Sequence, residues 1–175
     1  MGWEKLLGRA KCQSFPAHKI PVSPFLFLYN KSMKNNDEVI DMKINKFGIS
    51  VVAVDYDGTL TTENAYPAVG TPNIRAVEIM KRFRALGGRV ILWTLRTNKY
   101  LDDAVASMKS LGLEFDAVND DDEICKKEWL EAHPDCGISR KTFADLYIDD
   151  RTPHAMIHGI DWDEIEEMLL VPVQF

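Results

Sequence analysis

Two aspartates, Asp55 and Asp57, stand one residue apart at the end of an apolar run in this 175-residue chain. The run over 51–54 is rich in β-branched residues without polar alternation, which is typical of a strand buried on both faces. Asp-Gly pairs are common at ordinary turns, so it is the whole string Asp-Tyr-Asp-Gly-Thr-Leu after such a strand that indicates a site. Gly58 lets the chain turn sharply there. Two carboxylates on a rigid strand end, with backbone N–H groups beside them, suit a metal ion and a phosphoryl group.

Two more apolar runs end in polar side chains. One stops at Thr94, and another stops at the acidic pair Asp149 and Asp150. From residue 42 the chain alternates predicted strands and helices, which favours a parallel sheet with helices on both faces. Ligands bind at the carboxyl ends of the strands in such sheets. We therefore expect Asp55, Thr94 and Asp149 to converge.

The elements that must position these residues follow from hydrophobic period and capping signals. Buried strands are predicted over 49–55, 89–94, 115–118 and 146–149. A helix is predicted from an N-cap at Thr71 to the glycines at 87–88, and a second has its apolar face over 101–111. Further helices are predicted over 124–132 and 162–170, and the acidic segment 119–123 is expected to be a solvated loop or a helix start.

These motifs resemble those of the haloacid dehalogenase (HAD) superfamily, over about residues 47–152 and in the family order. Asp55 to Leu60 resembles motif I, the run ending at Thr94 resembles motif II, and the segment ending at Asp149 and Asp150 resembles motif IV. The stretch over 140–150 is also similar to that of 5′(3′)-deoxyribonucleotidase-like HAD proteins. The resemblance implies a single Rossmann-like, three-layer α/β domain over 42–175 and a Mg²⁺-dependent phosphatase.

The chemistry of a phosphate ester assigns roles to these residues, because a catalyst must neutralise the phosphate and align the attack. Asp55 is the expected nucleophile, which passes through an aspartyl-phosphate. Asp57 is the expected general acid and base, and the Thr94 hydroxyl would donate to a phosphoryl oxygen. By resemblance, Asp55, the Asp57 carbonyl and Asp149 would bind Mg²⁺ directly, whereas Asp150 would act through water or orient ligands.

A cation is also needed because four carboxylates in one site repel one another. Lys141 is the expected motif III lysine, and Lys126 and Lys127 are its rivals, with Arg140 a weaker one. Two arginines, Arg96 and Arg151, each follow a motif closely and are candidates for contact with the substrate phosphate.

The distances between motifs exclude a sizeable cap domain. Thr94 follows Asp55 by only 39 positions, which a flap and one predicted helix fill. Lys141 follows Thr94 by 47 positions, which two predicted helices and a strand fill. We therefore expect an open site for a small phosphorylated substrate or a bulkier one, with a second copy of the chain as a candidate lid. Nucleotide specificity does not carry over, because the deoxyribonucleotidases have a small cap.

Composition limits the other functions. The net charge of −6 argues against a general nucleic-acid binder. The three cysteines form no disulfide framework, which favours the cytoplasm, and Cys125, His133 and Cys136 match no compact zinc pattern. No stretch is long enough to cross a membrane. Residues 1–41 contain prolines and scattered bases, and we expect a disordered or non-native extension there.

Three alternatives remain at the level of sequence. A receiver domain also uses Asp, Thr, Lys and an acid pair, but its acid pair follows the first strand, whereas here the pair comes last. A catalytically idle or regulatory binding protein on the same fold would commonly lose its catalytic acids, and Asp57 is present. Phosphotransfer to an acceptor other than water stays open.

Overall fold

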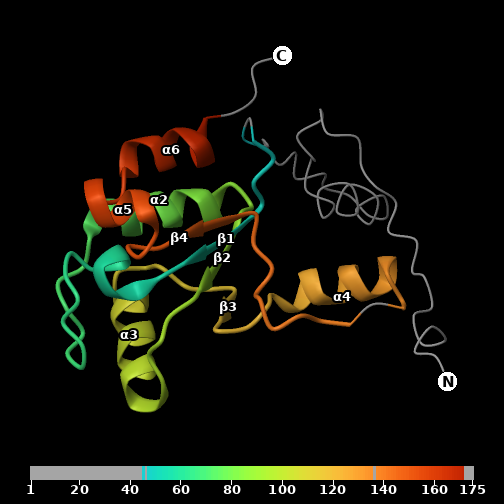
Figure 1. The fold of residues 1–175 in the computed structure, drawn as a ribbon, viewed down its shortest axis with the longest axis horizontal. Helices are drawn as coiled ribbons and strands as arrows, with labels where there is room; N and C mark the ends of the chain where they lie inside the picture. Colours follow the sequence, from blue (N-terminus) through green and yellow to red (C-terminus); the bar gives the residue numbers. More distant parts are fainter. Residues whose placement is uncertain (1–44, 46, 136, 172–175) are drawn as a thin grey trace, which may run out of the picture.

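A four-stranded parallel sheet forms the centre of the protein (Figure 1). The computed structural model describes residues 45, 47–135 and 137–171, and the predicted extension over 1–41 lies outside them. The strands run in the order β3-β2-β1-β4. Their bounds are β1 Val51–Val54, β2 Arg89–Leu92, β3 Ala117–Val118 and β4 Leu146–Ile148.

The register of the sheet aligns the strand ends that matter for the site. Val54, the last residue of β1, pairs with Leu92 of β2 on one side and with Ile148 of β4 on the other. All these pairs are parallel. The residues that follow the three strands therefore emerge at one edge of the sheet.

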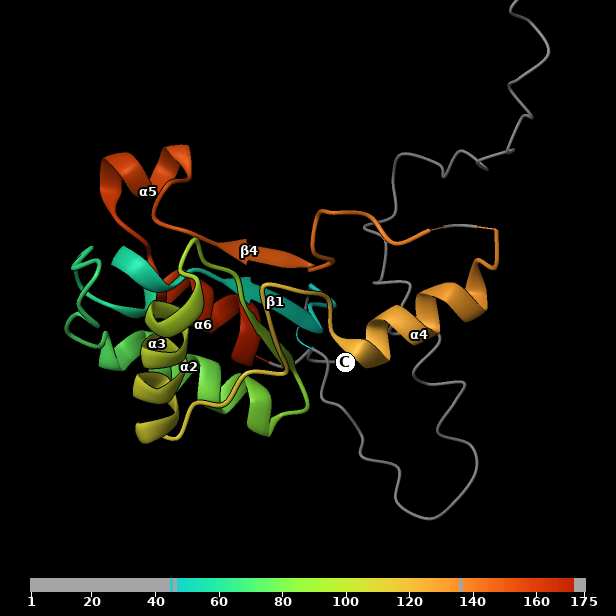
Figure 2. The same ribbon diagram turned by 90° about the horizontal axis from the view of Figure 1, so that it is seen from below.

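Helices α2, α3 and α6 cover one face of the sheet, and Figure 2 shows them together on one side of the strands. This face holds the larger core, in which strand residues such as Val52 and Leu92 pack with Met80 and Met108. The opposite face is covered by α4 and by the segment before β4, through Cys125, Trp129 and Phe143. The helices are α2 Ile74–Ala85, α3 Asn98–Ser110, α4 Glu123–Ala132, α5 Pro153–His158 and α6 Trp162–Leu170, and a single turn, η2, spans Tyr56–Leu60.

The predicted fold class is confirmed: the chain forms a single α/β Rossmann-like domain. The expected strands are present but shorter. β1 and β3 begin two residues later than expected, and β1, β2 and β4 end one or two residues earlier, before the polar residues that follow them. The N-cap of helix α2 lies two residues later than expected. The side chain of Asn73, and not that of Thr71, accepts the capping hydrogen bond from the Ala76 N–H. Helix α5 was not among the expected elements; Thr152 caps it and Pro153 opens it.

Two aspartates fasten the amino ends of the strands, opposite the site. Asp145 accepts hydrogen bonds from the Ser50 and Val51 N–H groups and from the Ser50 hydroxyl. Asp116 accepts one from the Val90 N–H and two from the Arg84 guanidinium, at 2.9 and 3.1 Å. These contacts hold β4 and β2 in register with β1, which keeps their carboxyl ends level.

Within the described part of the chain, no separate cap domain interrupts the α/β order. Nor does any helix there combine the length and the apolar character that crossing a bilayer requires.

Candidate metal and phosphoryl site

The carboxyl ends of β1, β2 and β4 open into a cavity of about 780 Å³. The expected convergence is thus confirmed, since Asp55, Thr94 and Asp149 line the same space. Asp57 also faces it. The remaining lining residues are Asn64, Tyr66, Trp93, Leu95, Arg96, Asn119 and Arg151.

Three carboxylates form the centre of the site. Asp55, Asp149 and Asp150 each offer an oxygen, and these oxygens lie within 4.8 Å of one another. Backbone contacts fix the loops that carry them: the Asp55 N–H donates to the Ile148 carbonyl at 2.9 Å, and the Asp150 N–H donates to the Thr59 hydroxyl oxygen at 3.1 Å. The first and last strands of the site are therefore held to each other directly at the cluster.

The electrostatics of this cluster suit a cation. The pKa of Asp55 is raised to about 7. Burial is the largest cause and the negative charges of Asp149, Asp150 and Asp57 add to it, whereas a hydrogen bond from the Tyr56 backbone opposes the rise. Burial and the charge of Asp149 also raise the pKa of Asp150. The buried Oδ1 atom of Asp150 has no hydrogen-bond partner among the described residues. An all-oxygen donor set with an unsatisfied buried oxygen fits a hard divalent metal ion.

Gly58 allows the acids to approach the turn after β1. Its φ angle is +78°, in the left-handed region that side chains disfavour. A Cβ atom at this position would lie only 2.6 Å from Oδ2 of Asp150. Both the backbone conformation and the packing therefore require glycine here.

Asp57 belongs to a different arrangement, because its carboxylate is paired with Arg96. The guanidinium donates two parallel hydrogen bonds to it, from Nε at 2.8 Å and from Nη2 at 2.7 Å. The Arg96 side chain is only 1% exposed, and the hydrogen bonds to Asp57 raise its pKa. Arg96 was a candidate for contact with the substrate phosphate; its burial and its pairing instead direct it to Asp57.

Arg96 also holds the flap, which we define as residues 62–72 between η2 and α2. Its Nη1 donates to the Pro67 carbonyl at 3.4 Å, and its Nη2 donates to the Ala68 carbonyl at 2.6 Å. The Tyr56 hydroxyl adds a bond to the Val69 carbonyl at 2.8 Å. The carboxylate of Asp57 and the backbone of the flap are thus joined through one buried side chain.

Thr94 is held at the mouth of β2 by Asn119. The Asn119 Oδ1 accepts from the Thr94 N–H at 2.8 Å, and its Nδ2 donates to the Arg96 carbonyl at 3.4 Å. The Thr94 Oγ1 accepts a bond from the Arg96 N–H at 3.3 Å. Among the described residues the Thr94 hydroxyl donates no hydrogen bond, and Thr94 lines the cavity.

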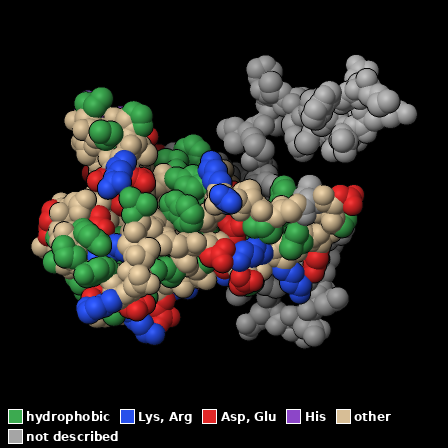
Figure 3. All heavy atoms as spheres, turned by 60° about the horizontal axis from the view of Figure 1, so that its bottom comes forward, with side chains coloured by type: hydrophobic (Ala, Val, Ile, Leu, Met, Phe, Trp, Pro, Cys, Tyr) green, Lys and Arg blue, Asp and Glu red, His purple; other side chains and the backbone are tan. Residues whose placement is uncertain are grey.

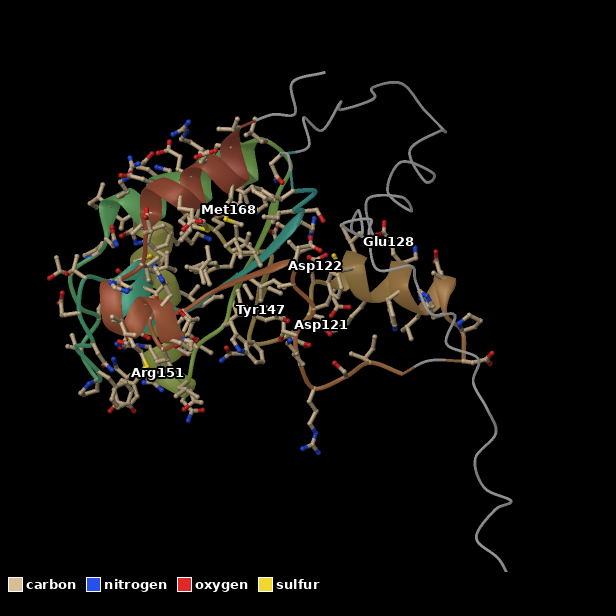
Figure 4. The ribbon with its side chains drawn as sticks, turned by 45° about the horizontal axis from the view of Figure 1, so that its top comes forward. Asp121, Asp122, Glu128, Tyr147, Arg151 and Met168 are labelled. Carbon is tan, nitrogen blue, oxygen red and sulfur yellow. The ribbon has the colours of Figure 1, made fainter. Side chains whose placement is uncertain are left out.

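The structure does not bring the lysine candidates to this cavity. Lys141 lies with its Nζ 4.8 Å from the centre of the Tyr147 ring and lines a second cavity beside α4. Figure 4 shows Tyr147 near Asp121, toward α4, and Arg151 next to α5. Lys126 pairs with Asp120 and Glu123. The catalytic role of Lys141 stays a prediction, and the exposed cation at the site is Arg151, whose Nε lies 4.0 Å from Asp150.

The weaker sequence candidates also have places. Lys127 is exposed on α4, 3.9 Å from Glu131. Arg140 is exposed in the segment before β4. His154 and His158 lie on α5 with their ring centres 4.9 Å apart, and Cys125 is buried against the sheet.

One solved structure is similar to this chain over most of the described domain. It is described as a conserved protein of Bacteroides thetaiotaomicron, and the two sequences are 39% identical. The match covers 67% of this chain and 87% of that one, with a TM-score of 0.55. The chain belongs to the same family as this conserved bacterial protein. No family model matches the chain, and no curated protein is similar to it.

The relationship supports the fold but assigns no reaction, so the function must be inferred from the chemistry of the site itself. Several of its lining residues were not singled out from the sequence, among them Asn119 and Tyr66. Asn119 has a φ angle of +51°, and only its place after β3 brings it to Thr94. Tyr66 stands in the flap, where no hydrophobic period marks it. The partner of Arg96 was missed because 39 positions separate it from Asp57.

Proposed function

We propose that this protein is a Mg²⁺-dependent phosphatase of the HAD type, which hydrolyses a phosphomonoester through an aspartyl-phosphate. The proposal rests on the two different environments of the four aspartates. Three carboxylates gather where a cation fits, and the fourth, Asp57, stands apart in an ion pair beside them. A purely metal-binding site would have no use for a separate, rigidly held carboxylate facing the same cavity.

The proposed reaction begins with attack by a carboxylate oxygen of Asp55 on phosphorus. The new bond joins Asp55 to the phosphoryl group and the ester P–O bond breaks. Asp57, which must first exchange one of its hydrogen bonds from Arg96 for a proton from water, gives that proton to the leaving oxygen. Asp57 then takes a proton from a water molecule that attacks the same phosphorus. Phosphate leaves, and the Asp55 carboxylate is regenerated.

Other residues hold the reacting groups in place. The Thr94 hydroxyl donates to a phosphoryl oxygen, since its own oxygen already accepts from the Arg96 N–H. Arg96 fixes the rotamer of Asp57, and Arg151 offers an exposed guanidinium to the phosphate. Asp55, Asp149 and the Asp57 carbonyl would hold Mg²⁺ directly and Asp150 would support it, and the ion would supply positive charge against the phosphoryl oxygens.

The finer expectations about context belong to the same proposal. A small phosphorylated substrate fits a cavity of about 780 Å³. Buried Cys125 is a free thiol, which accords with the reducing cytoplasm. The open mouth of the site accords with a second copy of the chain as a lid.

The proposal is tested by phosphate release from p-nitrophenyl phosphate with purified protein. We expect activity with Mg²⁺, loss in EDTA and recovery when Mg²⁺ is restored. The Asp55→Asn variant should lose at least about 1,000-fold in kcat, because no other side chain replaces the nucleophile. Asp102→Asn is the matched control, since Asp102 is an exposed acid of α3 outside the cavity.

Three results would count against the assignment. Undiminished activity in chelator would remove the metal from the proposal. Substantial turnover by Asp55→Asn, with a melting temperature no lower than that of wild type, would remove Asp55 as the nucleophile. Mg²⁺ binding without hydrolysis of any phosphomonoester tested would favour the regulatory binding protein instead.

A further inference from the structure

Three large apolar or aromatic side chains stand in the walls of the cavity beyond the acids. Leu95 is 81% exposed and Tyr66 is 57% exposed, and both line the cavity together with the partly buried Trp93. A single exposed apolar side chain is ordinary, whereas several gathered at one cavity mark a binding surface. Because they lie beside the carboxylates, these side chains would contact the part of a substrate other than its phosphoryl group.

Apart from Thr94 and Arg151, which face the phosphoryl group in the proposed reaction, the polar side chains of the same walls make hydrogen bonds within the protein. Asn119 uses both its oxygen and its nitrogen on backbone groups, and Arg96 is committed to Asp57 and to the flap. Asn64 accepts a hydrogen bond from the Tyr66 N–H at 3.3 Å. A sugar or another group rich in hydroxyls would find few partners here, whereas an apolar group would bury Leu95 and Tyr66.

Tyr66 is exposed and yet held in place. Its ring meets the ring of Tyr100 edge to face, with 5.3 Å between centres and 65° between planes. The guanidinium carbon of Arg96 lies 5.4 Å from its centre, and the same arginine binds the two carbonyls that follow Tyr66 in the flap. A fixed aromatic ring costs little conformational entropy when it binds a ligand.

Charge restricts the ligand further. Of the two arginines that line the cavity, Arg96 is buried and paired, so Arg151 is the basic side chain exposed to the solvent, with 62% of its side chain accessible. One guanidinium and one metal site are enough for a single phosphoryl group. Among the described residues, the cavity offers no second unpaired basic side chain for another anionic group.

We propose that the substrate is a phosphomonoester whose leaving group carries a planar aromatic ring, which stacks on Tyr66 and packs against Leu95. This inference rests on the phosphoryl site of the proposed function and adds the class of leaving group. Tyr66 is then a residue that determines specificity, and it takes no part in the bond changes at phosphorus.

Binding of two phosphonates tests the proposal without any turnover, because their C–P bond is not hydrolysed. With Mg²⁺ present, calorimetry should give wild-type protein a preference of about five- to ten-fold for phenylphosphonate over methylphosphonate, the size expected of one aromatic contact. Tyr66→Ala should abolish the preference, and Tyr66→Phe should keep it. Leu86→Ser is the control, since Leu86 is a 42% exposed leucine that does not line the cavity.

Kinetics supply a second arm with phenyl phosphate and glycerol phosphate. We expect Tyr66→Ala and Leu95→Ser to raise KM for phenyl phosphate about five-fold or more, with KM for glycerol phosphate changed less than about two-fold. Uniform loss with both substrates would contradict the proposal, because it would show general damage to the site.

The outcomes separate this inference from the proposed function. If neither ester is hydrolysed but the phosphonate preference depends on Tyr66, the reaction is wrong and the recognition of an aromatic group stands. Equal binding of the two phosphonates by wild type overturns the inference, whether or not the protein is a phosphatase.

A second copy of the chain is the competing occupant of these apolar side chains. Figure 3 shows further hydrophobic side chains exposed on α5, where Met156 and Ile157 are 74% and 75% exposed. If Leu95→Ser and Tyr66→Ala separate a dimer in solution without changing the phosphonate preference, the rim is an interface and the proposal fails.

Discussion

Asp55 combines burial with three negative neighbours, and this combination has a measurable consequence. In the metal-free protein its pKa is about 7, well above the ordinary value of 3.8. The carboxyl is therefore protonated in the folded state over a pH range in which the unfolded chain is ionised. The stability that this proton contributes is fully present below about pH 4 and is lost as pH rises through about 7.

The metal-free protein should reveal this through Asp55→Asn, which does not titrate. We expect the melting temperature of the variant to exceed that of wild type by a margin that grows from pH 5 to pH 8, and Mg²⁺ should reduce the margin. The binding of Mg²⁺ to wild type should weaken below pH 7, up to about ten-fold per unit, because the ion displaces a proton. Calorimetry across pH measures both quantities, and a pH-independent affinity would contradict the buried, protonated carboxyl.

Gly58 gives a second prediction at the scale of one residue. Gly58→Ala places a Cβ 2.6 Å from Asp150 Oδ2 and strains a φ angle of +78°. We expect a loss of about 1–2 kcal/mol in stability from the backbone, and at least about ten-fold weaker Mg²⁺ binding because Asp150 must shift.

Gly112→Ala is the matched control, because Gly112 has a φ angle of +81° and its Cβ would meet only the side chain of Lys81, at 3.5 Å. It should lose similar stability and keep full metal affinity. Equal metal affinity in the two variants would show that contact with Asp150 does not matter.

Among the elements, the flap and the turn after β1 depend on one another through Arg96. That side chain donates to the carboxylate of Asp57 and to two flap carbonyls, and its guanidinium carbon lies 4.7 Å from the centre of the Tyr56 ring. Nothing in the local pattern of either element requires this link. It arises because the end of β2 delivers residue 96 between them.

Removal of this link should lower kcat by more than the loss of stability alone explains. Arg96→Met leaves Asp57 without its partner and frees the flap, and we expect a stability loss of about 3 kcal/mol and a fall in kcat of about ten-fold or more per folded molecule. Arg96→Lys should recover part of the stability, but less of kcat, because it lacks the two parallel donors.

Arg84→Met provides the comparison, since Arg84 also donates two bonds to an aspartate, Asp116, at the far end of the sheet. Steady-state kinetics and denaturation of both variants check the prediction. If kcat falls equally in the two, the effect is general destabilisation, and Arg96 has no special role in the site.

At the scale of the whole molecule, the sequence predicts those features that depend on strand ends. Apolar runs that stop at Asp55, Thr94 and Asp149 are enough to bring these residues together, because parallel strands in register end at one edge. The position of Lys141 could not be obtained in this way. It lies in an irregular segment before β4, where no period indicates direction, and the structure turns it toward Tyr147.

The same distinction explains the other differences. The pairing of Asp57 with Arg96 and the contact of Asn119 with Thr94 join residues from separate loops, and their spacing along the chain carries no signal for either contact. The helix α5 is only six residues long, which is too short for a hydrophobic period to stand out.

The strand order also dictates when this centre can come into being during synthesis. Strand β1 lies inside the sheet, between β2 and β4. Because β4 is the last strand along the chain, it leaves the ribosome after the other three, and Asp149 and Asp150 follow it. A nascent chain that stops short of residue 146 holds Asp55, the proposed nucleophile, but not Asp149 and Asp150. Under the proposed function, such a chain would neither bind the metal ion nor act on a phosphate until those two aspartates have emerged.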